Sequence, residues 1–302
     1  MRFSERIHDV GATLTSKYIV GEGFLGAVEE TYEYLNQYPE QVEFKLDFDI
    51  DQKIENLKQE DVLFSVMDHL CHNLRFFLFT NVYKMHSYIA SLISAVNRPH
   101  LVSSALYVRN IVECTAVFNY YYRKYDPIMS RAVHFKSIDE YIECVVDLSN
   151  IFKDYRNRTR FDWKSLLEGD MVSLGNAHLK QQRISEDERQ VNIMTMIEKI
   201  GGDKESARFF YSYISELVHP NKGSQFLLID RVIKNNDGTI HGFLKRDRID
   251  DEGALVVFFT ATALPLKIHC SNFKVIAEEF KQGLTCFEET IQSFQQEWKK
   301  RL

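Results

Sequence analysis

Apolar residues recur along this chain mainly with the period of an α-helix. In most segments they fall three or four residues apart, which is typical of helices that bury one face. Turn signals at Asn97-Arg98-Pro99, Asp126-Pro127 and Gly201-Gly202 mark helix ends. Asp203 as an N-cap, and Ser137 with Glu140 as a capping box, mark helix starts. We therefore predict helices over residues 24–36, 61–81, 85–96, 100–124, 137–155, 186–200, 203–219, 251–282 (bent at Pro265) and 284–301.

The pattern changes after Pro220. Residues 225–233 and 239–245 are strand-like, and Asn235-Asn236-Asp237-Gly238 between them is a turn signal, so they predict a β-hairpin. The fold class is therefore all-α, a predominantly helical bundle with one β-hairpin inserted near residues 225–246. We expect an N-terminal helical extension over residues 1–50 and a single helical domain over residues 51–302.

The composition is that of an ordinary globular protein. Hydrophobic residues make up 45% of the 302 positions and aromatic residues 13%, which excludes a disordered chain. The formal net charge of -6 gives no global attraction to nucleic acid or to an anionic membrane. No apolar run reaches the roughly 18 residues that a membrane span needs. Five scattered cysteines without a CxxC pair, and the lack of a secretory signal, favour the cytoplasm.

The best candidate site lies on the helix predicted over residues 203–219. Tyr211, Ser215 and His219 are spaced i, i+4, i+8, so they share one stripe of that helix. The stripe lies among apolar residues, where polar groups need partners and where a histidine titrates near neutral pH. His219 is either part of a site or a cap at the end of its helix.

A second polar pair lies in the middle of an apolar helix. Arg109 and Glu113 are four residues apart and can form an ion pair. Their charges are costly to bury alone, so they either point into a polar pocket shared with the stripe of Tyr211, Ser215 and His219, or form a purely structural pair.

Two further groups of residues are weaker candidates. His69 and His72 face one way on a helix and could bind a metal, but the sequence supplies no second half of a zinc pattern, so we predict no metal. Arg156, Arg158 and Arg160 lie beside aromatic residues and could bind a phosphate or single-stranded nucleic acid. The acidic charge balance favours a solvated loop instead.

Signatures of common enzymes are missing from the sequence. It contains no GxxxxGK[ST], GxGxxG, GxSxG or HExxH motif. Ser215 and His219 could serve as nucleophile and base, but no residue is marked as their orienting acid. The sequence therefore predicts no cofactor and leaves open whether the protein is an enzyme.

Several short motifs resemble those of an uncharacterised helical family of bacteria and their mobile elements. The motifs are Arg109-Asn110-Ile111-Val112-Glu113, Trp163, and Tyr211-x-x-x-Ser215-Glu216-x-x-His219-Pro220. The resemblance covers roughly residues 65–225. It implies an all-helical core in which these polar residues cluster, and it implies no established activity.

A looser similarity is to the HEPN group of prokaryotic toxin and defence ribonucleases. That group is marked by an arginine, four to six residues, and a histidine near the end of a helix. The match in this chain is Arg2 to His8, at the extreme N-terminus, and Arg208 is too far from His219. The similarity implies a ribonuclease only if Arg109 takes the place of the missing arginine in space.

Three functional hypotheses follow. The first is a helical scaffold or sensor that binds a small ligand or a protein partner through Arg109, Glu113, Tyr211, Ser215 and His219. The second is a defence-associated nuclease in which His219 is the general base and Arg109 holds phosphate. In the third, the polar cluster is structural and the hairpin pairs with a partner or with a second copy in a homo-oligomer.

Overall fold

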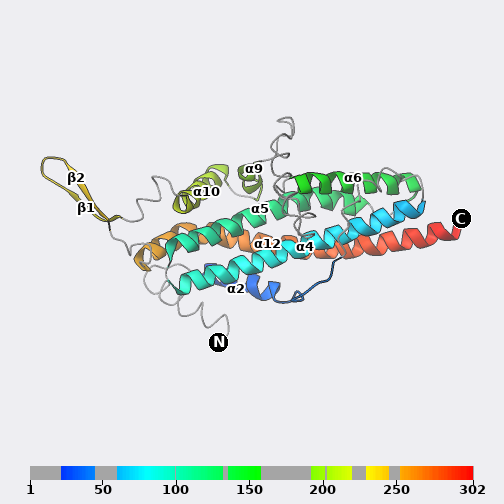
Figure 1. Cartoon of the computed structure of the whole chain (residues 1–302), viewed down its shortest axis with the longest axis horizontal. Coiled ribbons are helices and arrows are strands. Elements are labelled where there is room, and N and C mark those ends of the chain that lie inside the picture. Colours follow the sequence, from blue (N-terminus) through cyan, green and yellow to red (C-terminus); the bar gives the residue numbers. More distant parts are fainter. Residues whose placement is uncertain are drawn as a thin grey trace, which may run out of the picture. The chain divides into compact units, whose positions relative to one another are not determined.

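A computed structural model describes residues 22–44, 60–98, 100–131, 135–157, 192–200, 203–219, 229–244 and 252–301. These residues are helical except for short connections and one hairpin, which confirms the predicted fold class (Figure 1). The helices are α2 (Glu22–Leu35), α4 (Glu60–Asn97), α5 (Leu101–Arg131), α6 (Ile138–Asn157), α9 (Ile193–Ile197), α10 (Lys204–Val218) and α12 (Glu252–Arg301), and the strands are β1 (Ile229–Lys234) and β2 (Ile240–Leu244).

Three helices are longer than the sequence pattern predicts. The helices predicted over 61–81 and 85–96 are one helix, α4, and those predicted over 251–282 and 284–301 are likewise one helix, α12. Helix α5 continues past Pro127, where we expected it to end. Buried residues beyond each predicted break explain the differences, because the helix must continue to place them in the core.

The structure confirms the predicted capping residues. Asp203 is the N-cap of α10, where its carboxylate accepts a hydrogen bond of 2.8 Å from the Ser206 backbone N–H. Ser137 caps α6 in the same way by accepting from the Glu140 N–H. The helix predicted over 186–200 is described only as the short α9, because residues 186–191 lie outside the described residues.

The described residues belong to two compact units. Unit 1 is drawn from Met1–Glu40, Thr80–Tyr120 and Ile193–Ala277, and unit 2 from Gln41–Phe79, Tyr121–Asn192 and Glu278–Leu302. Helices α4, α5 and α12 each contribute one part to unit 1 and another part to unit 2. The predicted domain boundary near residue 50 lies outside the described residues and stays a prediction.

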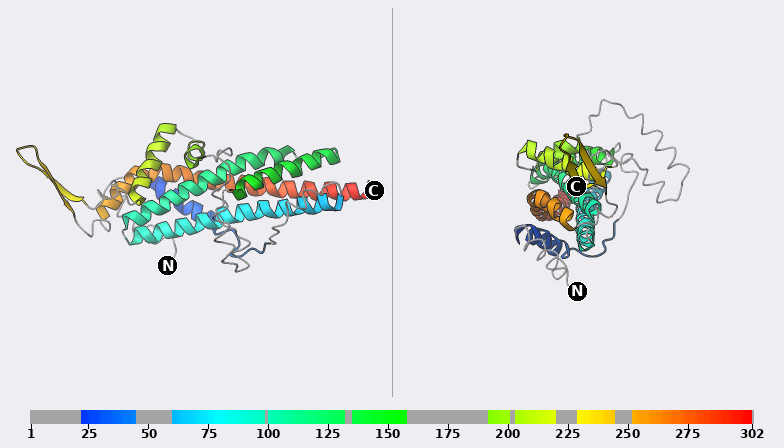
Figure 2. Two further views of the ribbon diagram at one scale, coloured as in Figure 1. Left: turned by 45° about the horizontal axis from the view of Figure 1, so that its top comes forward. Right: turned by 90° about the vertical axis from the view of Figure 1, so that its left-hand side faces the viewer.

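The core of unit 1 forms where α2, α5 and the first part of α12 pack together (Figure 2). Phe118 of α5 and Phe273 of α12 are fully buried, with ring centroids 5.1 Å apart. The Thr31 hydroxyl of α2 donates to the Cys270 carbonyl of α12 at 3.2 Å. The Phe118–Phe273 contact holds α5 against α12, and α5 carries Arg109 and Glu113.

Unit 2 is built around aromatic side chains. The Phe77 ring of α4 lies within aromatic contact distance of Tyr121 and Tyr125 on α5, Tyr155 on α6 and Phe280 on α12. Edge-to-face geometry predominates, as expected for buried rings. One aromatic cluster therefore links the segments of α4, α5, α6 and α12 that the structure describes in unit 2.

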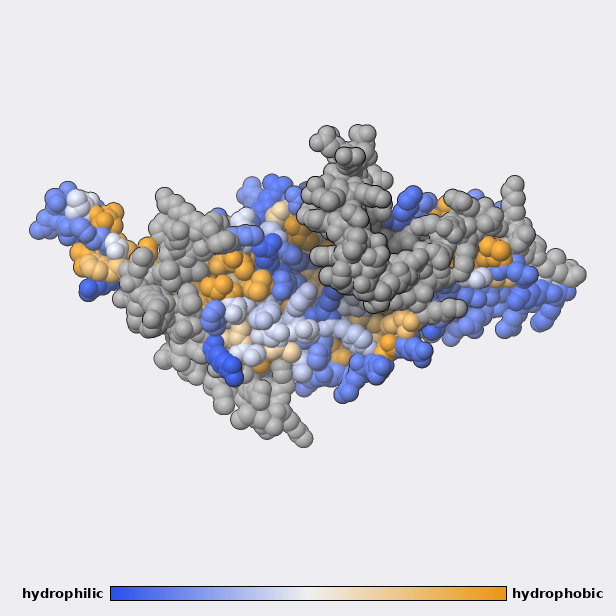
Figure 3. Space-filling view, in the orientation of Figure 1, coloured by the Kyte–Doolittle hydropathy of each residue, from blue (hydrophilic) through white to orange (hydrophobic). Residues whose placement is uncertain are grey.

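The hairpin confirms the turn signal in the sequence. β1 and β2 pair antiparallel, and Gly238 in the turn has φ of 85°, a conformation that favours glycine. Residues 231–243 are all exposed, including the apolar Val232 and Ile240. Figure 3 shows apolar side chains, in orange, at the surface of the hairpin.

Helix α5 is long and apolar enough to cross a membrane by length and composition alone. Just over half (56%) of its most apolar window is buried inside the protein, as in the core helix of many globular proteins. The absence of a membrane association, like the cytoplasmic location, stays a prediction.

Candidate functional site

The candidate site starts with the pair on α5. Arg109 and Glu113 lie one helical turn apart, and the Arg109 Nε donates to Glu113 Oε1 at 2.7 Å. Their side chains are 22% and 32% exposed, so the pair lies at the edge of the helix packing, open to solvent on one side. The ion pair predicted from the i, i+4 spacing is therefore formed.

Helix α10 brings a third side chain to the same carboxylate. The Tyr211 hydroxyl donates to Glu113 Oε1 at 2.5 Å, across 98 residues of sequence. The Arg109 guanidinium lies 5.5 Å from the centre of the Tyr211 ring, in cation–π contact. Glu113 thus accepts two hydrogen bonds with one oxygen and ties α10 to α5.

His219 completes the cluster from the end of α10. Its backbone N–H donates to the Ser215 carbonyl at 3.0 Å, so His219 caps the helix through its main chain. Its ring is free for another role: Arg109 Nη1 donates to His219 Nε2 at 3.0 Å. Because a guanidinium has only donors, Nε2 is unprotonated here and the ring proton lies on Nδ1.

The local charges support this arrangement of the cluster. Burial lowers the pKa of Arg109, but the hydrogen bond and charge of Glu113 outweigh that effect and raise the pKa above its ordinary value. Burial, and then the hydrogen bond to Glu113, raise the pKa of Tyr211. Arg109 therefore stays cationic and Tyr211 stays a hydrogen-bond donor at physiological pH. Below, "the Arg109 cluster" means Arg109, Glu113, Tyr211 and His219.

Ser215 is the predicted site residue that does not join the Arg109 cluster. It lies between Tyr211 and His219 along α10, but its hydroxyl oxygen is buried and has no hydrogen-bond partner among the described residues. A nucleophile–base contact between Ser215 and His219 is therefore not formed, because the His219 ring turns towards Arg109 instead.

Of the two weaker candidates, only the pair of His69 and His72 lies within the described residues. His72 is exposed and its Nδ1 lies 2.8 Å from the Asp68 carbonyl of its own helix. No group of three or more His, Cys, Asp or Glu side chains among the described residues could hold a metal ion. Arg158 and Arg160 lie outside the described residues, as does the side chain of Arg156.

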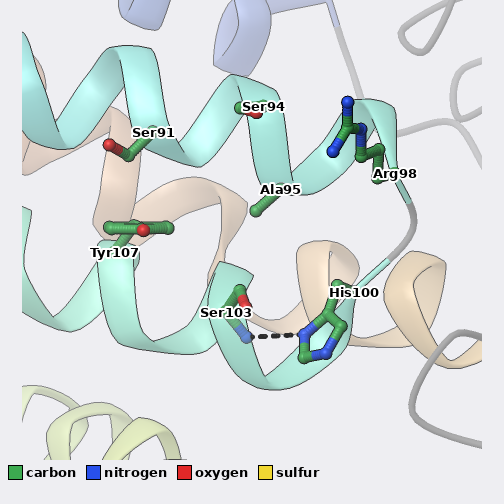
Figure 4. Close-up of a pocket in the computed structure, with 7 residues that line it drawn as sticks. All are labelled: Ser91, Ser94, Ala95, Arg98, His100, Ser103 and Tyr107. Carbon is green, nitrogen blue, oxygen red and sulfur yellow. Dashed lines mark hydrogen bonds between the residues drawn. The ribbon is translucent and has the colours of Figure 1, made fainter.

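A cavity that the sequence did not indicate lies between α4 and α5, near their connection (Figure 4). Its volume is about 540 Å³, and it does not include the Arg109 cluster. The Ser103 backbone N–H donates to His100 Nδ1 at 3.2 Å beside it, which caps the first turn of α5. Serine side chains on helices are usually exposed to solvent, so the serines in this part of the sequence did not indicate a cavity. The lining residues are Ser91, Ser94, Ala95, Arg98, His100, Ser103 and Tyr107.

Comparison with protein family models, with curated proteins and with solved structures finds no match to this chain. The resemblances to an uncharacterised bacterial family and to the HEPN group therefore stay predictions.

Proposed function

We propose that the protein is a non-catalytic helical scaffold or sensor that binds an anionic group through Arg109 and His219. The group belongs to a small ligand or to a protein partner. The observation that carries the proposal is the direct contact between Arg109 and His219. This contact is exposed to solvent, and Glu113 holds the Arg109 guanidinium in place from its other side.

The chemistry of the two side chains favours an anion. The Arg109 guanidinium has five N–H donors, of which Nε is bound to Glu113 and one on Nη1 is directed at His219. A carboxylate or phosphate accepts from paired donors of this kind. His219 is exposed and can donate a ring N–H to the same anion once it turns away from Arg109. Because Glu113 and Tyr211 fix the guanidinium, little ordering remains to be done on binding.

Binding of inorganic phosphate and of citrate tests the proposal, with the histidine ring signals followed by NMR. We expect the His219 signals to shift with a dissociation constant of about 0.1–10 mM. Arg109→Lys should weaken binding at least about tenfold, because lysine keeps the charge but not the paired donors. Arg208→Lys is the matched control, since Arg208 pairs with Glu198 at 2.5 Å outside the Arg109 cluster. Unchanged His219 signals up to about 50 mM of either anion would contradict the proposal.

A second candidate function is a nuclease of the kind that the HEPN similarity implies. The Arg109–His219 contact favours it, because it brings an arginine and a histidine together although they are far apart in the sequence. Arg109 would hold the phosphate and His219 would take the proton from the attacking hydroxyl. In the structure, however, the His219 Nε2 lone pair is occupied by Arg109, so this base must first be released.

Cleavage assays separate the two candidates. Purified protein is incubated with single-stranded RNA and with DNA, with and without divalent cations. The scaffold or sensor proposal expects both substrates to remain intact. Cleavage that His219→Ala abolishes, while Ser212→Ala (an exposed α10 residue) leaves it unchanged, would replace that proposal with a nuclease.

A further inference from the structure

The first part of α12, within unit 1, exposes apolar side chains on the side opposite its buried face. Val257, Leu264, Ile268 and Val275 are 64%, 67%, 39% and 51% exposed. The same stretch buries Phe258, Phe259, Leu266, Cys270 and Phe273. A helix that is apolar on both sides is normally covered on both. Figure 2 shows this part of α12, in orange, at the edge of the helices of unit 1.

The exposed positions have the spacing of a helix–helix seam. With the exposed small residues Ala261 and Ser271 they occupy positions 257, 261, 264, 268, 271 and 275, in steps of four and three. This alternation is the a/d pattern of a coiled coil, in which side chains pack against a partner helix. Below, these six residues are called the α12 seam.

The α12 seam reads almost the same in both directions about residue 266. Val257 mirrors Val275, Ala261 mirrors Ser271, and Leu264 mirrors Ile268. Two copies that cross antiparallel at residue 266 therefore place each side chain opposite one of nearly equal size. A surface of this kind is self-complementary, as a two-fold symmetric dimer requires. We propose that the α12 seam binds a second copy of the chain, in an antiparallel pair of α12 helices.

The area of the α12 seam matches a weak dimer. Complete burial of a valine, leucine or isoleucine side chain removes about 60–120 Å² of apolar surface from water. At their observed exposures, the four large residues offer about 200 Å² per copy, or about 400 Å² in a dimer. An interface built around so small an apolar centre falls below the roughly 1,200–2,000 Å² of stable complexes, which fits a weak dimer. The expected dissociation constant is about 1–100 μM.

The charge beside the α12 seam adds a distinguishing property. Lys267 is exposed and flanks the seam next to its mirror point, so each Lys267 lies near its own symmetry mate in the dimer. Like charges repel weakly at such a site, and salt screens them. Association should therefore strengthen as the salt concentration rises.

Sedimentation equilibrium tests the interaction on the full chain. We expect a monomer–dimer equilibrium that Leu264→Asp weakens at least about 30-fold, since it places a charge at the centre of the contact. Phe209→Asp is the matched control: Phe209 on α10 is 76% exposed and lies outside the α12 seam. A wild-type chain that stays monomeric up to about 500 μM, or equal weakening by both variants, would overturn the proposal.

Cross-linking tests the orientation. In a Cys286→Ser background, which removes the exposed thiol, Lys267→Cys should cross-link between chains with a short bis-maleimide reagent. Val257→Cys should not, because its symmetry mate lies about 27 Å away along the antiparallel pair, 18 residues at 1.5 Å each. Both variants keep the buried face of α12 intact and should fold. Efficient cross-linking of Val257→Cys, as in a parallel pair, would overturn the antiparallel arrangement.

Discussion

Acidification from pH 7.5 to 4.5 should cost the protein about 2–3 kcal/mol of stability through one buried histidine, His269. His269 lies on α12 in unit 1, 6% exposed, and its Nδ1 has no hydrogen-bond partner among the described residues. Burial lowers its pKa from the ordinary 6.5 to about 4. The folded chain therefore resists a proton that the unfolded chain accepts.

The sign and range follow from these two pKa values. The contribution of His269 to stability is fully present above pH 6.5 and is lost as the pH falls towards 4. Each pH unit in that window costs about 1.4 kcal/mol, which is the free energy of one unit of pKa shift. His269→Leu removes the titrating group and the unpaired nitrogen together, so its stability should fall less on acidification.

Urea unfolding of wild type and His269→Leu at pH 7.5 and 4.5 measures this contribution. The free energy of unfolding that each protein loses on acidification is determined, and the two losses are compared. Other groups titrate in both proteins and cancel. His241→Leu is the control, because His241 is exposed on the hairpin and should leave the pH dependence unchanged. If wild type and His269→Leu lose the same free energy of unfolding on acidification, His269 is not held neutral by burial.

Local signals allowed much of the fold to be predicted. The N-cap Asp203, the hairpin turn with Gly238 and the 3.6-residue periodicity each depend on residues close together in sequence. Such features follow from backbone geometry and from one buried face, so a single sequence carries them. The hairpin and α10 were accordingly found at nearly their observed bounds.

The length of the long helices could not be predicted locally. Pro127 lacks an N–H and costs an interior helix about 3 kcal/mol, and Gly283 costs about 1 kcal/mol. Both lie inside helices because residues beyond them are buried: Ile128 and Met129 after the proline, Leu284 and Phe287 after the glycine. Which residues are buried depends on packing between distant segments, and the local sequence does not contain that information.

The candidate site was predicted in its parts but not in its connections. The i, i+4 spacing predicted the Arg109–Glu113 pair, and the stripe on α10 predicted that Tyr211 and His219 share a face. Which atoms meet was not predictable, because Arg109 and His219 are 110 residues apart. The sequence suggested Ser215 as a member of the cluster, and the structure leaves its hydroxyl outside it.

Glu113→Ala should lower the free energy of unfolding by about 2 kcal/mol. Its carboxylate accepts from both Arg109 and Tyr211, so its removal leaves the Arg109 Nε and the part-buried Tyr211 hydroxyl without their acceptor. Hydrogen bonds to charged groups contribute about 1.5–3 kcal/mol each when buried. Because Glu113 is 32% exposed, water replaces part of this loss, which brings the expected total below the sum for two buried bonds, to about 2 kcal/mol.

Denaturant unfolding of a graded series checks this value. Tyr211→Phe removes one of the two hydrogen bonds and should cost about 1 kcal/mol, while the Arg109–Glu113 pair remains. Glu216→Ala, an exposed glutamate on α10, is the control and should stay within about 0.5 kcal/mol of wild type. A Glu113→Ala protein as stable as that control would show that the Arg109 cluster does not hold α10 on α5.

The effect of His219→Ala separates the two halves of the Arg109 cluster. His219 is exposed and its capping bond uses the backbone, which alanine keeps, so the loss of stability should not exceed about 0.5 kcal/mol. If Glu113→Ala loses much stability and His219→Ala loses little, then Glu113 and Tyr211 are the residues that hold α10 on α5. The face formed by Arg109 and His219 is then available to a ligand. Residues that serve binding often contribute nothing to stability or lower it. A small effect of His219→Ala is therefore expected if His219 belongs to a ligand site. A loss of about 2 kcal/mol at His219 as well would instead make the whole cluster a structural connection between α5 and α10.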